Sequence, residues 1–268
     1  METMSVENIT LYFDAQEREA AELIRRACEK TVQLMREHWG LDTPPDLRVY
    51  VMTSWLRSTF RAAPWPQKLK LGLLFPFWAV RARQMWPYAG GWERSYGERR
   101  TVCIKPPRLI PLGDSHIGDQ IFVQENDARE KVRHITCHEL VHAFTSHLQL
   151  PAWLKEGLAM VTVDRFFARP TVRQETLDVL ERWSRKTGSQ DNQRLNVRDR
   201  DATVYLYARG YWLTRYIEDT RPGLLNDLFS QRHLEDKLAS AYEKPAGEFW
   251  KEIDGVAVAH FKWGGKMK

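Results

Sequence analysis

The chain has little cysteine and no long apolar run. Its 268 residues include three cysteines, Cys28, Cys103 and Cys137, at unrelated spacings. An odd number of cysteines argues against a disulfide framework and is typical of reduced thiols. No stretch approaches the roughly 18 consecutive apolar residues of a membrane-spanning helix. The first ten residues carry Glu2 and Glu7 and no apolar run, unlike a signal peptide. We therefore expect a cytoplasmic protein.

Internal repeats and long linkers are also absent from the sequence. A chain of this length buries one sizeable core, or two closely packed lobes. Apolar residues make up 43% of the chain, with 11 Trp, 11 Phe and 9 Tyr, which excludes extended disorder. The net charge of +5 is uneven, because residues 57–105 hold ten Lys or Arg against Glu93 and Glu98. No nucleic-acid-binding motif accompanies these cations, so we expect no nucleic-acid partner.

Hydrophobic periodicity differs between the two halves of the chain. Residues 14–39 predict a long helix that ends at Gly40, and residues 46–52 alternate as a strand does. Residues 101–105 predict a further strand, which Pro106-Pro107 ends. Beyond Pro151 the pattern is helical almost throughout. The sequence therefore predicts an α+β fold, with an N-terminal α+β lobe at 1–148 and a helical lobe at 149–268 that together form one catalytic unit.

The stretch from His134 to Met160 carries the chemistry. His138 and His142 are four residues apart, so on a helix their imidazoles project from one face and can share a cation. Glu139 is rotated by about 100° from His138 and would flank the metal, where a general base for a metal-bound water belongs. His134 lies one turn earlier, and imidazoles at three successive turns span too much helix for one ion. We therefore interpret His134 as a core or wall histidine.

A catalytic zinc usually has three protein ligands and one open position, so the two histidines need a partner. Glu156 is the best candidate, because the turn at Gln149–Pro151 folds a second helix back towards the first. The alternative is that the motif occurs by chance, and an H-E-x-x-H string is expected about 0.02 times in a chain of this length and composition. The second motif favours one Zn²⁺ per chain on His138, His142 and Glu156.

With these residues the chain resembles the gluzincin metallopeptidases of the thermolysin and aminopeptidase-N type. The resemblance rests on H-E-x-x-H followed by W-L-x-E-G-L-A, which is Trp153–Ala159 here. It implies a zincin-like catalytic domain that hydrolyses peptide bonds, with Glu139 as the general base. No counterpart of the aminopeptidase G-x-M-E-N segment is present, so the expected activity is endopeptidase-like. In this family a strand before the histidine helix forms an edge that pairs with substrate, and the matching residues are Val102, Cys103 and Ile104.

The resemblance also implies a role for Tyr207. Aminopeptidase-N-type enzymes carry a helix that opens Y-x-x-G, whose tyrosine hydrogen-bonds the oxyanion, and this chain has that pattern at 207–210. The alternative is that Tyr205, Tyr207 and Tyr211 are ordinary aromatic packing.

Two further alternatives stay open. The main rival function is a zincin-fold binding or scaffold protein with a structural zinc and no turnover. The segment 64–97 is apolar and basic, with Trp65, Phe75, Phe77 and Trp78 near several Lys and Arg. It is interpreted either as a docking surface for a membrane or an acidic protein, or as an irregular insertion that covers the strand at Thr101.

Overall fold

The computed structural model describes residues 1–87, 89–112, 117–187, 200–229 and 233–264. Side chains outside this description are those of Phe77, Trp78, Arg81, Ala82, Met85, Lys186 and Thr187. The chain divides into two compact units. Unit 1 comprises the described residues of Met1–Asp114 and Gln124–Ser146, and unit 2 comprises those of Ser115–Val123 and His147–Lys268.

Unit 1 is built on a five-stranded sheet in the order β1-β2-β3-β5-β4. β2 pairs with β3, and β3 with β5, in parallel, whereas the outer strands β1 and β4 are antiparallel to their neighbours. The turn between β4 and β5 contains Gly97 at φ +63°, a left-handed conformation that favours glycine. The strands are β1 (Glu2–Val6), β2 (Ile9–Phe13), β3 (Asp46–Val51), β4 (Gly91–Tyr96) and β5 (Arg99–Ile104).

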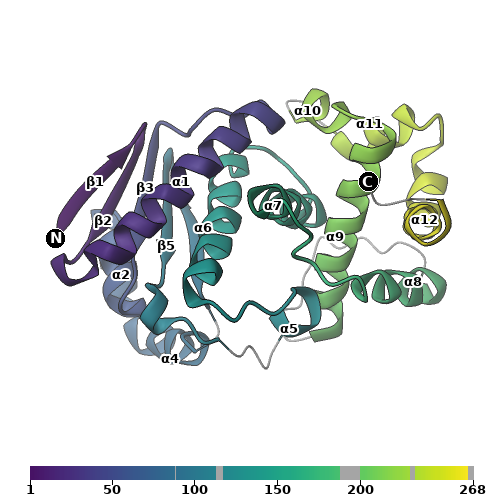
Figure 1. Cartoon of the computed structure of the whole chain (residues 1–268). Helices are drawn as coiled ribbons and strands as arrows, with labels where there is room; N and C mark the ends of the chain where they lie inside the picture. The colour runs from purple at the N-terminus through teal and green to yellow at the C-terminus, as the bar shows by residue number, and fades with distance from the viewer. Residues whose placement is uncertain (88, 113–116, 188–199, 230–232, 265–268) are drawn as a thin grey trace. The chain divides into compact units, whose positions relative to one another are not determined.

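Two long helices cover one face of this sheet. α1 (Arg18–Trp39) packs on β1 and β2, and α6 (Ala128–Thr145) packs on β4, β5 and α1 (Figure 1). The burial of Leu47, Val49 and Val102 follows from the period of two in a strand, which turns alternate side chains to this helical face. α1 ends, as predicted, at Gly40 with φ +63°. The residues that carry the H-E-x-x-H motif therefore lie on a helix held by a sheet and a second helix.

The opposite face of the sheet is covered by shorter helices. Tyr50, Met52 and Cys103 are buried there against Ala62, with Trp86 and Trp92 packed on the cluster. α2 is capped by Ser54, whose hydroxyl accepts a hydrogen bond from the Arg57 N–H. The helices that follow β3 are α2 (Trp55–Ala62), α3 (Trp65–Leu73) and α4 (Phe75–Met85).

Unit 2 is helical apart from one bridge between Phe122 and Val172 in its described part. Its centre is the pair α7 and α9, which α8 and α12 join. A buried ion pair fixes α12 to α9, because Asp254 accepts from Arg209 Nε at 2.9 Å and from the Tyr205 hydroxyl at 2.6 Å. The helices are α5 (Gly118–Ile121), α7 (Ala152–Phe167), α8 (Thr176–Thr187), α9 (Arg200–Thr220), α10 (Leu224–Leu228), α11 (Leu234–Ala241) and α12 (Ala246–Ala259), followed by a π-helical turn, η3 (His260–Gly264).

The prediction of an α+β fold is confirmed at that level of detail, whereas the zincin-like identity stays a prediction. The predicted division at 148/149 falls two residues after the end of unit 1 at Ser146. The predicted lobe 1–148 differs at residues 117–123, which belong to unit 2 because Arg173 donates to the Asp119 carbonyl and Phe122 pairs with Val172. None of the described helices is long and apolar enough to cross a membrane.

Candidate functional site

The helix α6 has a buried face and a half-buried face. Val132, Cys137, Leu140 and Val141 are buried, whereas His134, Ile135, His138, Glu139 and His142 are half-buried. Asp127 caps the helix by accepting a hydrogen bond from the Arg129 N–H at 2.8 Å. The predicted arrangement of His138, Glu139 and His142 along one face is therefore present.

The two histidines converge. Their Nε2 atoms are 3.1 Å apart, with ring centroids 4.7 Å apart and ring planes at 84°. Two nitrogen ligands of one tetrahedral zinc lie about 3.3 Å apart, since each Zn–N bond is about 2.0–2.1 Å long. A direct hydrogen bond between two neutral imidazoles has a similar length. The donor pair fits a shared cation without rearrangement of α6.

Glu139 lies next to this pair in sequence and extends its half-buried face. Its charge also acts on the sheet beneath α6: burial first, and the Glu139 carboxylate second, raise the pKa of the Cys103 thiol well above its ordinary value. Cys103, Cys28 and Cys137 are all free and buried. Glu139 is therefore a half-buried residue of a helix that the sheet and α1 hold in unit 1.

The prediction that Val102, Cys103 and Ile104 form the substrate-pairing edge is wrong. These residues lie on β5, which pairs with β3 on one side and with β4 on the other. Both rows of backbone groups are therefore used within the sheet, and the three side chains are fully buried. The edge strand on this side is β4.

β4 starts directly beside the histidine face of α6. A Cβ added at Gly90 would lie 2.3 Å from the Ile135 side chain, and one at Gly91 would lie 2.9 Å from it. Ile135 is one turn before Glu139, so the two glycines let the strand approach this face of α6 without displacing the Ile135 side chain. The sequence signal for this strand is limited to the turn at Gly97, because residues 92–96 do not alternate between apolar and polar side chains.

The register shows which backbone groups β4 turns to the edge. The Lys105 N–H donates to the Gly90 carbonyl at 2.9 Å, directly ahead of the pair Gly91 and Ile104. Hydrogen-bonded and non-hydrogen-bonded pairs alternate in an antiparallel ladder. Gly91, Glu93 and Ser95 therefore point their N–H and C=O groups away from β5.

In unit 2, Glu156 lies in the second turn of α7. Lys155 and Glu156 are half-buried, whereas Trp153, Leu154 and the residues from Gly157 to Val163 are buried. The Trp153 indole N–H donates to Glu235 at 3.2 Å and anchors the start of α7 within the unit. Glu156 thus combines a fixed backbone with a half-buried side chain.

α7 and α9 cross at two glycines. A Cβ on Gly157 would lie 2.2 Å from the carbonyl oxygen of Gly210, and a Cβ on Gly210 would lie 2.3 Å from that of Trp153. The glycines of W-L-K-E-G-L-A and Y-A-R-G are therefore needed for this helix contact. The same contact fixes the helical segments that carry Glu156 and Tyr207.

Tyr207 differs from its neighbouring tyrosines. Tyr207 is half-buried, whereas all the remaining residues from Thr203 to Thr214 are buried. Its ring meets Phe122 edge-on, with centroids 6.3 Å apart and planes at 85°. Tyr205 donates to Asp254, and Tyr211 donates to Asp164 at 2.6 Å. The packing interpretation thus describes Tyr205 and Tyr211 better than Tyr207.

Asp164 belongs to a separate, structural network. Its Oδ1 accepts from the Thr171 N–H and hydroxyl, both at 2.7 Å, and its Oδ2 accepts from Tyr211. Burial raises the pKa of the Asp164 carboxyl against these hydrogen bonds, and it also raises that of the Tyr211 hydroxyl. This network ties the residues after α7 to α9.

Comparison with known proteins leaves the family open, because no family model and no curated protein matches the chain.

Proposed function

We propose that this chain is a zinc-dependent metallopeptidase of zincin-like fold, with one Zn²⁺ held by His138, His142 and Glu156. One observation carries the proposal: two imidazole nitrogens 3.1 Å apart stand beside Glu139 on the half-buried face of a single helix. Metal-assisted hydrolysis needs a pair of metal ligands such as these histidines, with a carboxylate nearby that can act as the general base.

The sequence is the reason for proposing Glu156 as the third ligand. A catalytic zinc site takes three protein ligands, and the spacing from His142 to Glu156 resembles that of the gluzincins. Its half-buried position in α7 supports this role, since a ligand must be held by packing yet open to the ion. Gly157, the next residue, packs α7 on α9 and fixes the backbone that carries the carboxylate.

The chemistry is the hydrolysis of a peptide bond. When bound, zinc lowers the pKa of a water molecule and polarises the scissile carbonyl. Glu139 accepts a proton from the water as its oxygen bonds to the carbonyl carbon, and delivers that proton to the leaving amine as the C–N bond breaks. Tyr207 donates its hydroxyl hydrogen to the oxyanion that develops in the transition state.

Substrate binding falls to β4 in this proposal. An extended peptide adds to a sheet edge through main-chain hydrogen bonds. Gly91, Glu93 and Ser95 offer outward N–H and C=O groups on the strand nearest to Ile135 and the histidine face. The backbone pairing first expected of β5 is thus transferred to its neighbour.

Metal analysis tests the proposal. Purified chain loaded with zinc and dialysed against a mild chelator should keep about one zinc per chain, and Glu156→Ala should lose most of it because two ligands hold the ion weakly. Glu248→Ala, an exposed glutamate of α12, is the matched control and should keep its zinc.

Three results would contradict this account. A wild type that binds no zinc excludes the metal site, and full zinc retention in Glu156→Ala excludes Glu156 as a ligand. A zinc that four protein side chains hold, with no hydrolysis, would instead favour the binding or scaffold protein with a structural metal.

A further inference from the structure

Exposed apolar side chains concentrate on one short part of unit 1. Six of the eleven exposed large hydrophobic residues in the described part of the chain lie between positions 65 and 80. Single exposed apolar residues are ordinary, but a group of this size on adjacent short helices marks an interaction surface. The group consists of Trp65, Leu69, Leu73, Leu74, Phe75 and Val80.

Three of these residues form a stripe along α3. Trp65, Leu69 and Leu73 are spaced by four, so they share one face of the helix, and they are 72%, 57% and 83% exposed. No residue of α3 is buried. Lys70 is exposed and Lys68 half-buried on the same helix. α3 is therefore a short helix with an outward apolar stripe and flanking cations.

The turn between α3 and α4 carries the most exposed apolar tip. Leu73, Leu74 and Phe75 follow one another, with exposures of 83%, 57% and 43%. Phe75 also touches Phe60, with ring centroids 6.4 Å apart, so it is partly used in packing. Leu73 and Leu74 thus form a tip that can be buried in a partner at little cost to the fold.

The formal charges of α3, α4 and the turn between them have one sign. Residues 64–87 contain four Lys or Arg and no Asp or Glu, whereas Arg57 and Arg61 of α2 pair with Asp14. Such a segment attracts a negatively charged partner and is repelled by a basic one.

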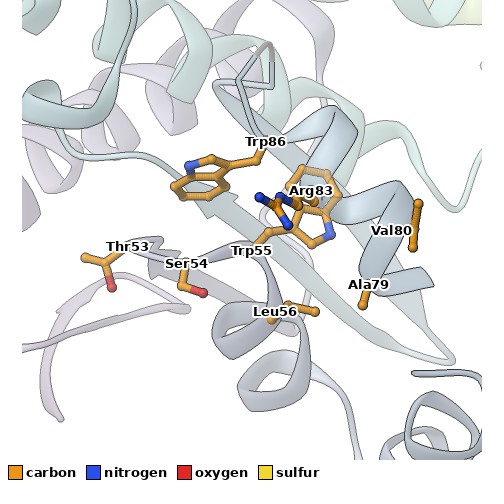
Figure 2. Close-up of a pocket in the computed structure, with 8 residues that line it drawn as sticks. All are labelled: Thr53, Ser54, Trp55, Leu56, Ala79, Val80, Arg83 and Trp86. Carbon is orange, nitrogen blue, oxygen red and sulfur yellow. The ribbon is translucent and has the colours of Figure 1, made fainter. Parts of the chain in front are cut away.

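A pocket opens beside this surface. It has a volume of about 470 Å³ and is lined by the start of α2, Thr53–Leu56, and by Ala79, Val80, Arg83 and Trp86. Figure 2 shows the two indoles of Trp55 and Trp86 and the Arg83 guanidinium on its wall. Val80 belongs to both the pocket and the exposed group. The surface therefore continues into a recess that offers a cation and two hydroxyls.

We propose that α3, α4 and the turn between them dock this protein on an anionic membrane surface. Leucines and Trp65 would enter the boundary between headgroups and acyl chains, while Lys68, Lys70 and Arg83 meet lipid phosphates and carboxylates. Protruding side chains on a turn suit a deformable lipid surface better than the preformed groove of a folded protein. Helices of nine and eleven residues lie on a bilayer and do not span it. Part of segment 64–97 has another role, since Trp86 and Trp92 pack on the sheet.

Vesicle sedimentation tests this surface without metal or substrate, so its outcome is independent of the proposed peptidase. The protein is mixed with vesicles of phosphatidylcholine alone, or with about 30% phosphatidylserine, in EDTA. Wild type should bind the anionic vesicles more tightly, and high salt should weaken that binding. Leu73→Ser with Leu74→Ser should weaken binding by at least about 10-fold, and Lys68→Gln with Lys70→Gln by roughly 30-fold.

Matched controls separate docking from general stickiness. Trp263 is 76% exposed in unit 2, so Trp65→Ser is compared with Trp263→Ser, and only the former should reduce binding. Lys237→Gln with Lys251→Gln makes the same charge change on exposed lysines of unit 2 and should leave binding unchanged. Equal melting temperatures show that the variants remain folded.

Three outcomes would overturn the proposal. Wild type that does not sediment with anionic vesicles leaves an acidic protein as the partner. Equal losses in the unit 2 controls mean a non-specific charge effect. If the lysine variant loses vesicle binding and the leucine variant keeps it, the protein is attracted to the charged surface but does not insert its leucines into the membrane.

Discussion

Gly157 and Gly210 meet where α7 crosses α9, with so little space that a Cβ on Gly157 would lie 2.2 Å from the Gly210 carbonyl oxygen. Each glycine adjoins a candidate functional side chain: Glu156 precedes Gly157, and Tyr207 lies one turn before Gly210. Both short motifs singled out in the sequence therefore contain the residue that fits the helices together. The same two segments therefore carry the contact between α7 and α9 and the two candidate functional residues.

Gly157→Ala should destabilise the protein even though alanine favours a helix. The new methyl group meets backbone atoms, which cannot move aside, and overpacking of this kind costs about 1–3 kcal/mol or more. Gly255→Ala on α12 is the control, because nothing lies within 4 Å of its new Cβ, and it should stabilise by up to about 1 kcal/mol. Urea unfolding measures both. Equal effects would mean that the crossing of α7 and α9 is looser than described.

Tyr207→Phe should lower kcat by about 100-fold, with little change in KM or melting temperature. The reason is that a donor aimed at the developing oxyanion acts on the transition state more than on bound substrate. Steady-state kinetics on a peptide substrate measures the effect.

Tyr205→Phe is the matched comparison for that experiment. It removes the buried hydrogen bond to Asp254 and should cost roughly 1–3 kcal/mol of stability while leaving kcat near normal. Tyr207 would be a packing residue if its variant lost stability and kept full turnover.

The long periodic segments were the predictable part of this fold. The helix that ends at Gly40, the strand at residues 46–51 and the helix with His138 and His142 follow from burial patterns spread over many residues. β1, β2, β4, α3, α4 and α5 were missed. Each is short, and β4 exists because Gly90 and Gly91 let it approach Ile135, which is a tertiary reason that a local pattern does not contain.

The site was predictable only where its residues share a helix. The spacing of His138 and His142 fixes their convergence, whereas substrate pairing depends on strand order. Thr101–Ile104 has the composition of any buried strand, so its place inside the sheet was not visible. Tyr207 resembles Tyr205 and Tyr211 in sequence, and only burial and partners separate the three.

Lys105 should make stability rise with pH in the alkaline range. Burial lowers the pKa of its ammonium from 10.5 to about 8, although it donates to the Trp86 carbonyl and its Nζ lies 4.1 Å from the Trp86 ring centroid. Between these two values the unfolded chain binds the proton and the folded chain does not. The stability from Lys105 is therefore fully present above about pH 10.5 and is lost as pH falls through about 8.

Lys105→Met should lack this dependence. Between pH 8 and pH 9.5, the free energy of unfolding of wild type should rise relative to that of the variant by up to roughly 2 kcal/mol. Denaturant titrations at the two pH values measure it. Parallel pH profiles would show that the lysine is solvated in the folded chain.

Glu93→Pro should spare the sheet and impair catalysis. The Glu93 N–H points to the edge, so proline removes a donor that β5 does not use. We expect a nearly unchanged melting temperature and kcat/KM reduced about 10-fold for peptide substrates. Arg94→Pro removes an inward donor and should cost about 3 kcal/mol or more. Unimpaired kcat/KM in Glu93→Pro would exclude β4 as the substrate strand.

The most direct test of the central claim is a peptide-library digest with zinc-loaded wild type and Glu139→Gln side by side. Glu130→Gln, an equal change on the same helix, serves as the control. We expect all three proteins to fold and hold zinc, wild type and Glu130→Gln to cleave peptides, and Glu139→Gln not to cleave them. Cleavage by Glu139→Gln at the rate of wild type, or no cleavage by zinc-loaded wild type, would contradict it.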